Sequence, residues 1–450
     1  MIRIAAAQAF WGDWPQAPAL QVRSGPIDYL ILDYLAEVTV AILQKQKARD
    51  ASMGYARDFV TDVSALLPEL MERDVKVISS AGGIAPRACA EALLATAAEL
   101  GVSELRVAVI EGDDIFDRLG TPVGSGLDLR ALDADGPSLE EIGPRLTSAH
   151  TYLGAQPIVQ ALREGAHVVV TGRCTDSALA LAPVIHEFDV APDDWDALAL
   201  GTVVGHVLEC GAQSTGGNYL EDWRAVPSPE TIGFPIAELE GPDRAVITKH
   251  HALGGLVTAG SVKEQLLYEI GDPRAYVTPD CIADFTSIEL RDEGGDRVSI
   301  SGVRGLPAPE TLKVSCVYSA GWKVTGQITY CWPEALAKAQ AAGELVRRRT
   351  EAALGRPFEA YLAEYVGAGA LFGPLGGARD ADEVVLRVSA RSPDREACDR
   401  LGRELVGLIL TGPPGATGYA AGRPRPSEVN NIWSGLVPRG QVRPRVEILG

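Results

Sequence analysis

Short runs of apolar residues alternate with longer helical patterns through the first half of the chain. The apolar runs cover residues 2–8, 28–33, 75–82, 105–113 and 167–172. Continuous apolar runs are typical of strands that are buried on both faces, and strands that alternate with helices form parallel sheets. We therefore predict an α/β domain over residues 1–225, with a mainly parallel, doubly wound sheet. A barrel is the weaker alternative, because too few strand–helix units are visible.

From about residue 230 the pattern changes to short alternating strands that are separated by turns, which is typical of antiparallel sheets. The tail then contains a strand, a helix, two strands and a second helix. These elements are expected at residues 322–331, 333–353, 357–366, 383–391 and 393–410. Their order is compatible with a ferredoxin-like split βαβ unit. We predict an α+β domain over residues 226–450, partly ferredoxin-like, which closes a cleft on the first domain.

Composition and charge exclude several classes of protein. A chain of 450 residues is long enough for two or three domains, and its net charge of −19 argues against binding to nucleic acid. No run approaches the roughly 18 apolar residues of a membrane span. The N-terminus lacks the basic start and long apolar core of a signal peptide, so we expect a cytoplasmic protein. We also expect a homo-oligomer.

The cysteines and histidines give little support for a metal site. Seven cysteines are scattered along the chain without a closely spaced pair, which argues against a metal cluster or a disulfide framework. One helical stretch places His206, Glu209 and Cys210 on one face, where they could hold a metal ion. Because no second cluster accompanies them, we predict no metal site.

Polar residues gather where the predicted strands of the first half end. In an open α/β sheet, ligands bind at the carboxyl ends of the strands, so these residues are candidates for a binding site. The candidates for substrate binding are Gln8, Trp11, Asp13, Ser80, Gly82, Gly83, Arg173 and Asp176. Arg173 and the amides after Gly83 are expected to hold an anionic group. The simplest alternative for each polar residue is that it caps a helix.

Asp33 and Glu37 are the leading candidates for acid/base catalysis. They stand four residues apart at the mouth of a predicted helix, so the charge of one carboxylate could raise the pKa of the other. Asp33 directly ends an apolar strand, which makes it the stronger candidate. For Glu37 the alternative is the general preference of acidic residues for helix N-termini.

The turn Gly-Arg-Cys-Thr-Asp at residues 172–176 raises the question of a reactive cysteine. Cys174 is expected at a helix N-terminus beside Arg173, and both features lower the pKa of a thiol. Spacing ties no histidine to Cys174, and cysteines are commonly buried and inert. We therefore predict a structural role for Cys174 and interpret Asp176 as a helix cap or an acid/base group.

Two glycine-rich segments lie where the two halves of the chain join, and clefts between domains are favoured ligand sites. The first, residues 211–219, contributes Thr215, Gly216 and Asn218 as substrate-binding candidates. In the second, residues 248–260, Lys249 and the adjacent His250 and His251 could supply a cation and a general acid/base near neutral pH. The alternative for these segments is a mobile surface loop.

Several segments resemble the acyclic terpene utilisation (AtuA) family. They are FWGDWPQAPALQV, GPIDYLILDYLAEVTVAIL, AGGIAPRACAEAL, GRCTDSALALAPVIHEF, LECGAQSTGGNY, GGLVTAGSVKEQLLYEIGDPRAYVTPD and GRPRPSEVNNIW. The resemblance covers nearly the whole chain. It implies chemistry on branched, terpenoid-like acids or their thioesters, with coenzyme A as part of the substrate and with no other cofactor.

This chain departs from the family pattern in three places. Many members have Asn where this chain has Ser80, and many have a Pro-Gly-Thr-Gly-Gly-like loop in place of residues 250–255. Longer members carry an extra small C-terminal domain, so the resemblance implies a short form, and a separate small protein could supply that domain as a partner.

These features favour an enzyme that acts on a small carboxylic acid or an acyl thioester by proton transfer, as a hydratase, a dehydratase or a carbon–carbon lyase. The alternative is a non-catalytic ligand-binding or scaffold subunit that requires a partner protein. The two hypotheses differ in whether the strand-end residues and the loop at residues 248–256 converge on one pocket.

Overall fold

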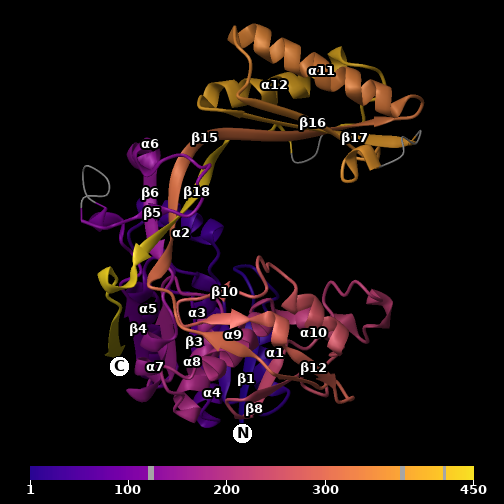
Figure 1. Cartoon of the computed structure of the whole chain (residues 1–450). Helices are drawn as coiled ribbons and strands as arrows, with labels where there is room; N and C mark the ends of the chain where they lie inside the picture. Colours follow the sequence, from indigo (N-terminus) through magenta and orange to yellow (C-terminus); the bar gives the residue numbers. More distant parts are fainter. Residues whose placement is uncertain (120–125, 376–380, 419–421) are drawn as a thin grey trace. The chain divides into compact units, whose positions relative to one another are not determined.

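The computed structural model describes residues 1–119, 126–375, 381–418 and 422–450, and these residues fold into two compact units. Unit 1 contains Met1–Val317 and Ile432–Gly450, and unit 2 contains Tyr318–Asn431. The chain enters unit 2 within strand β15 (Thr311–Cys331) and leaves it within strand β18 (Ser427–Pro438) (Figure 1). The two units therefore divide the chain differently from the predicted boundary at residue 225.

The apolar runs of the first half form neighbouring parallel strands in unit 1. In order across the sheet, these strands are β1 (Ile2–Gln8), β2 (Tyr29–Leu32), β3 (Lys76–Ser79), β7 (Val168–Thr171) and β4 (Val107–Glu111). Strands β2 and β7 are buried along their whole length, as expected for strands that are covered on both faces. The predicted parallel sheet is thereby confirmed.

Antiparallel strands extend this sheet at both edges, so that it contains ten strands among the described residues. Beyond β1 follow β8 (Ile236–Gly241), β9 (Arg244–Thr248), β13 (Val298–Ser301) and β12 (Glu289–Asp292). Beyond β4 lies β19 (Arg445–Leu449). The predicted change to antiparallel pairing after residue 230 is correct, but these strands continue the first sheet. Residues 226–317 consequently belong to unit 1.

Helices cover the central strands and bury alternate strand residues. One hydrophobic cluster joins Ala5, Leu30 and Val77 of the strands to the helices α1 (Ala17–Arg23), α3 (Arg57–Ser64), α4 (Leu67–Glu72) and α5 (Pro86–Glu99). Ala6, Ile31 and Val169 alternate with cluster residues along their strands and are also buried. Three further helices contact the same strands: α7 (Gln156–Arg163), α8 (Ala178–Phe188) and α9 (Trp195–Glu209).

Three elements of unit 1 complete the surroundings of the strand ends. They are α2 (Glu37–Arg49), β6 (Leu146–Thr151) and α10 (Ala259–Leu266). The helical pattern of the sequence starts at Tyr34, directly after the predicted strand at residues 28–33, but helix α2 begins three residues later, at Glu37. The delay has a local cause, because the Asp33 carboxylate accepts a hydrogen bond from the amide of Leu35 and holds a turn after β2.

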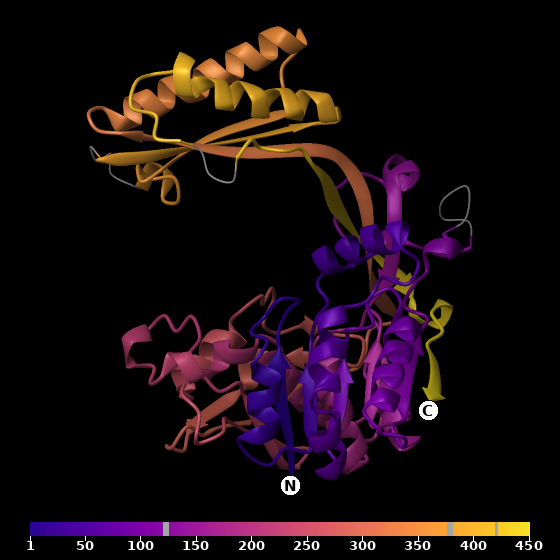
Figure 2. The ribbon, with the colours of Figure 1, turned by 180° about the vertical axis from the view of Figure 1, so that it is seen from behind.

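Unit 2 follows the order that the tail of the sequence predicts. It contains α11 (Ala335–Leu354), β16 (Ala360–Val366), β17 (Glu383–Ser392) and α12 (Arg395–Thr411), between β15 and β18. The strands pair in the order β16-β17-β15-β18, and both helices lie on the same face of this sheet (Figures 1 and 2). Among the described residues of both units, no helix combines the length and the apolar character needed to cross a membrane.

Candidate functional site

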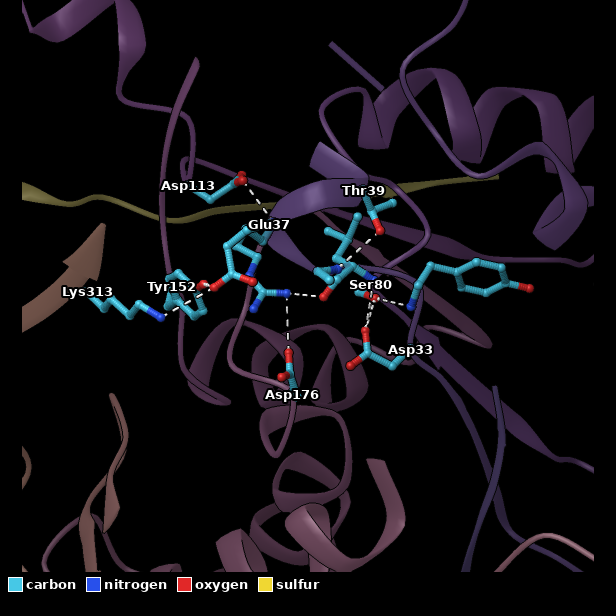
Figure 3. Close-up of polar contacts among 12 residues, drawn as sticks. Asp33, Glu37, Thr39, Ser80, Asp113, Tyr152, Asp176 and Lys313 are labelled. Carbon is cyan, nitrogen blue, oxygen red and sulfur yellow. Dashed lines mark hydrogen bonds and ion pairs between the residues drawn. The ribbon is translucent and has the colours of Figure 1, made fainter. Parts of the chain in front are cut away.

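Parallel strands bring several of the predicted polar residues to one edge of the sheet. Asp33 follows β2, Ser80 follows β3, Asp113 follows β4 and Arg173 follows β7. The Ser80 hydroxyl donates to Asp33 Oδ1 over 2.6 Å, and the Arg173 amide donates to Asp113 Oδ2 over 2.9 Å (Figure 3). The carboxyl ends of these parallel strands thus place two hydrogen-bonded pairs at one edge of the sheet.

Asp33 is buried, with an exposed fraction of 6%, and its carboxylate has defined partners. Besides Ser80, the Leu35 amide donates to Oδ1 over 3.1 Å. Burial raises the pKa of Asp33, although the charge of Arg173 and the two hydrogen bonds act in the opposite direction. Asp33 thus holds a proton more readily than an ordinary aspartate, which suits an acid/base residue.

Arg173 is a buried cation at the centre of this group. Its guanidinium stacks over the ring of Tyr152 at 4.2 Å from the ring centre and donates to the carbonyl of Leu35. It also lies 3.3 Å from Asp176 Oδ1 (Figure 3). Because these neighbours already balance its charge, Arg173 is less available to an anionic ligand than the sequence suggested.

Glu37 is the carboxylate of the predicted Asp33 and Glu37 pair that stays ionised. The Tyr152 hydroxyl donates to Glu37 Oε1, and Lys313 Nζ in β15 lies 3.4 Å from the same oxygen. Burial alone would raise the pKa of Glu37, but Arg173, Tyr152 and Lys313 hold it at about 2. Glu37 is therefore ionised at neutral pH, and the raised pKa of Asp33 arises first from burial.

A buried pair of residues fixes the turn that carries Arg173. Asp113 Oδ2 lies 2.9 Å from His150 Nδ1, and both side chains are almost fully buried. Burial alone would lower the pKa of His150, but the hydrogen bond and the charge of Asp113 raise it. A Cβ atom on Gly172 would lie 2.5 Å from Asp113 Oδ1, so this close packing requires glycine.

A pocket with a volume of about 680 Å³ opens beside Asp33, Glu37, Arg173 and Asp176. Of the described residues that line it, six carry a carboxyl group and Arg173 alone carries a cation. The carboxyl groups belong to Asp13, Asp33, Glu37, Asp176, Glu209 and Glu269. Apolar side chains form much of the remaining wall, including those of Phe10, Trp14, Leu35, Ile232 and Phe234. The pocket wall therefore combines carboxyl groups with apolar side chains.

Two of these carboxyl groups have strongly raised pKa values. Burial raises the pKa of Asp176 to about 7, with Asp33 and Glu37 acting in the same direction and Arg173 against it. Burial likewise raises the pKa of Glu209 to about 7, partly offset by His206. Titratable groups that change charge near neutral pH are typical of acid/base sites. Asp33, Asp176 and Glu209 therefore have raised pKa values, whereas the pKa of Glu37 is lowered.

Replacing Asp176 with asparagine is expected to stabilise the protein at alkaline pH. The unfolded aspartate loses its proton near pH 4, whereas the folded one keeps it until about pH 7, so wild-type stability falls across this interval. The melting temperature of Asp176→Asn should equal that of the wild type at pH 4 and exceed it by roughly 1–3 °C at pH 8, since partial exposure moderates the effect. Exposed Asp133→Asn is the control, and a lower melting temperature at pH 8 would contradict this prediction.

Several other predicted substrate-binding residues stand behind the pocket wall. The Ser80 hydroxyl is occupied by Asp33 and by the amide of Tyr34, and it positions Asp33. The Gln8 side-chain amide donates to the carbonyl of Phe10, and Trp11 Nε1 donates to Asp58. None of these side chains is among the described residues that line the pocket.

The predicted anion site after Gly83 is not formed by free amides. The amides of Gly83, Ile84 and Ala85 donate to the carbonyls of Ser80, Gly54 and Gly82. A Cβ atom on Gly82 would lie 2.6 Å from the carbonyl oxygen of Thr171. These glycines therefore allow close packing of the turn, and their amides are already used within it.

The glycine-rich segment at residues 211–219 contributes to the pocket only in part. Asn218 lines it, with Gln213 and Gly217, and Asp13 lines it from the first strand's loop. Thr215 is buried and its hydroxyl donates to the carbonyl of Ala212, while Gly216 has a φ of 101° that favours glycine. Sequence reasoning missed Phe234, Tyr268 and Glu269, because nothing in their local pattern sets them apart.

Lys249, His250 and His251 line a different pocket, with a volume of about 380 Å³. Lys249 Nζ lies 3.0 Å from Asp296 Oδ2 and donates to the carbonyl of Leu253, and His250 Nε2 lies 2.9 Å from the carbonyl of Gln21. The structure therefore does not bring these predicted catalytic residues to Asp33. Strand β9 ends at Thr248 beside β8, and Lys249, the next residue, pairs with Asp296.

Cys174 is buried, with an exposed fraction of 3%, and burial raises the pKa of its thiol. Native labelling with iodoacetamide should therefore modify Cys174 far more slowly than partly exposed Cys331, because the thiolate is the reactive form. Peptide mass spectrometry over a time course measures both rates. Rapid labelling of Cys174 with loss of ligand binding would show that the cysteine is reactive.

The helical face that could have held a metal ion forms a different contact. His206 Nδ1 pairs with Glu209 Oε1 over 2.8 Å, and His206 Nε2 faces the carbonyl of Gln265 over 3.0 Å. Across the described ranges, no group of three or more histidine, cysteine, aspartate or glutamate residues is placed to hold a metal ion.

The fold and the site together define a mixed α/β protein with an acidic pocket at the carboxyl ends of its parallel strands. A family model described as acyclic terpene utilisation family protein AtuA matches residues 2–448. The chain therefore belongs to the acyclic terpene utilisation family. No curated protein and no solved structure matched the chain.

Proposed function

We propose that the protein is an enzyme that transfers protons to and from the acyl part of a branched acyl thioester. The observation that carries this proposal is the set of carboxyl groups around Arg173, in which Asp33 and Asp176 have raised pKa values and Glu37 stays ionised. A carboxyl group with a pKa near neutral pH can both accept and donate a proton under physiological conditions.

The charge of the pocket favours a thioester over a free carboxylic acid. The carboxyl groups outnumber the one lining cation, and Arg173 is already paired with Asp176. A carboxylate ligand would therefore meet like charges in a partly buried site, which is unfavourable. A thioester carbonyl is uncharged and can accept a hydrogen bond from a protonated carboxyl group.

The apolar wall gives the site a place for a hydrocarbon chain. Phe10, Trp14, Ile232 and Phe234 line the pocket together with the carboxyl groups, and a volume of about 680 Å³ suits a branched acyl group of moderate size. The family description supports the same class of substrate, since acyclic terpenes are branched hydrocarbons. Coenzyme A is proposed as the carrier of the acyl group.

Deuterium incorporation tests this proposal directly. The protein is incubated in deuterated buffer with branched acyl esters of coenzyme A and, separately, with the matching free acids. Mass spectrometry should detect deuterium in the acyl chain of at least one thioester and none in the free acids. Absence of exchange in every thioester, or exchange in the free acids alone, would contradict the proposal.

The exchange experiment, combined with a binding measurement, distinguishes an enzyme from a non-catalytic ligand-binding subunit. Binding of thioesters without exchange, measured by calorimetry, would favour the non-catalytic alternative and a need for a partner protein. A small partner protein and a homo-oligomer remain proposals that size measurements on purified complexes can test.

A further inference from the structure

Glu209 is a pocket residue whose carboxyl group has one free oxygen. It is the last residue of α9, and 9% of its side chain is exposed. Oε1 pairs with His206, whereas Oε2 is buried and receives no hydrogen bond from any of the described residues. A buried acceptor without a partner is costly, and at a pocket wall it marks a place where a ligand atom can bind.

His206 holds Glu209 from the side away from the pocket. It is fully buried, and its ring lies 5.3 Å from the ring of Tyr276 and 5.5 Å from that of Phe285. The carbonyl of Gln265 can only accept a hydrogen bond, so His206 Nε2 donates to it. In the neutral ring Nδ1 is then an acceptor. In the charged ring, Nδ1 carries a proton and faces Glu209 Oε1 as a cation.

The backbone of α10 fixes this arrangement. The side-chain amide of Gln265 donates to the carbonyl of His206 over 2.8 Å, while the Gln265 carbonyl accepts from Nε2. Two hydrogen bonds therefore join Gln265 and His206, and the one from Nε2 orients the ring. When the ring is charged, its Nδ1 faces Glu209 Oε1 over 2.8 Å, so a proton carried by Glu209 lies on Oε2, at the pocket wall.

We propose that Glu209 is a second catalytic acid/base residue of this pocket, acting through Oε2, and that His206 is its positioning residue. This inference rests on the proposed function and assigns the reaction. With Asp33 as the base and Glu209 as the acid, the pocket can eliminate water from a 3-hydroxyacyl thioester, or add water in reverse.

The elimination is balanced without any further reactant. Asp33 takes the proton from the carbon next to the thioester carbonyl, and the electron pair of that C–H bond forms the C=C bond. The C–O bond at the next carbon breaks, and its electron pair leaves with the oxygen. The oxygen takes the proton of Glu209, so the products are an unsaturated acyl thioester and water.

Charged and titratable groups around Glu209 determine its behaviour with pH. Asp176 and Glu269 raise its pKa, and His206 lowers it. The titratable groups that interact with Glu209, from α9 and from the neighbouring segments, are Asp33, Asp176, His206, Cys210, Tyr268, Glu269 and Tyr276. Removing His206 should therefore move the alkaline limb of the pH profile for elimination to higher pH, which a purely structural residue would not do.

The test compares Glu209→Gln, Glu209→Asp and His206→Gln with wild type in two assays on 3-hydroxyacyl esters of coenzyme A. The assays are hydrogen exchange at the carbon next to the carbonyl and formation of the unsaturated product. Glu99→Gln, an exposed glutamate that ends α5, is the matched control and should leave both rates unchanged. Circular dichroism checks the fold of each variant.

We expect Glu209→Gln to lower elimination at least 100-fold while exchange persists within about threefold, because exchange needs only the base. Glu209→Asp should retain part of the elimination. Unchanged elimination in Glu209→Gln, or an equal loss of both activities, would overturn the assignment of Glu209. If wild type shows neither activity, the proposed function itself fails, and the two failures are thus distinguishable.

Discussion

Replacing Asp33 with asparagine is expected to slow hydrogen exchange into a branched acyl thioester on the order of 100-fold or more, about 3 kcal/mol in barrier. Asp33 is buried beside the pocket, and burial raises the pKa of its carboxyl group. Asparagine keeps the size and the acceptor that the Leu35 amide and Ser80 need, but it cannot accept a proton from carbon. Rates in deuterated buffer, followed by mass spectrometry, give the comparison.

The fold of Asp33→Asn should survive, since an asparagine oxygen replaces Oδ1 in the turn after β2. Ser80→Ala is the matched variant, because it removes the hydroxyl that positions Asp33 and leaves the carboxyl group in place. It should lower the rate less than Asp33→Asn does. Full activity in Asp33→Asn would limit Asp33 to holding the turn.

Replacing Arg173 with leucine is expected to lower the free energy of unfolding at pH 7 by about 3–5 kcal/mol, because it removes one partner of a buried ionic group. Arg173 is 4% exposed and interacts with Asp176 and Glu37. Without it, the ionised Glu37 would lose its main cation. Urea unfolding at pH 7 measures the change, and the loss should be smaller at pH 5, where more of these carboxyl groups are protonated.

A double-mutant comparison shows whether this loss arises from charge. Adding Glu37→Gln to Arg173→Leu should recover part of the stability, because the buried carboxylate is removed with its partner. Arg173→Lys keeps the charge but loses the flat contact with Tyr152, so it should cost less than leucine. A loss below about 1 kcal/mol in Arg173→Leu, or no recovery in the double variant, would contradict the ionic role.

Local patterns predicted the strands and helices well, and long-range pairing was harder to predict. The apolar run at residues 167–172 became β7 (Val168–Thr171), and the helix expected at 333–353 became α11 (Ala335–Leu354). The sequence shows no linker or change of pattern at the boundary of unit 2, because the chain crosses this boundary inside the continuous strand β15. The pairing of β19 with β4 joins residues over 300 positions apart, which no local pattern encodes. The finer descriptions, doubly wound and ferredoxin-like, stay predictions.

The part of the candidate site that lies at the ends of parallel strands could be predicted from the sequence. Asp33 and Arg173 follow from the rule that strand ends share one edge. The ionised state of Glu37 was not predictable, because it depends on Tyr152 and Lys313 from distant parts of the chain. The spacing of three residues between His206 and Glu209 places both on one helical face, but from the sequence alone this spacing was interpreted as a weak metal motif. Lys249 and His250 stood close to the glycine-rich segment in sequence but line a separate pocket.

The protonation of the pocket carboxyl groups is the most direct measurement of the proposed chemistry. Carbon-13 NMR of the aspartate and glutamate carboxyl carbons over pH 4–9, with Asp176→Asn and Glu209→Gln for assignment, gives the titration midpoints. We expect midpoints near pH 7 for Asp176 and Glu209. Midpoints below about 5 for both groups, close to those of ordinary carboxyl groups, would contradict an acid/base role for this pocket at neutral pH.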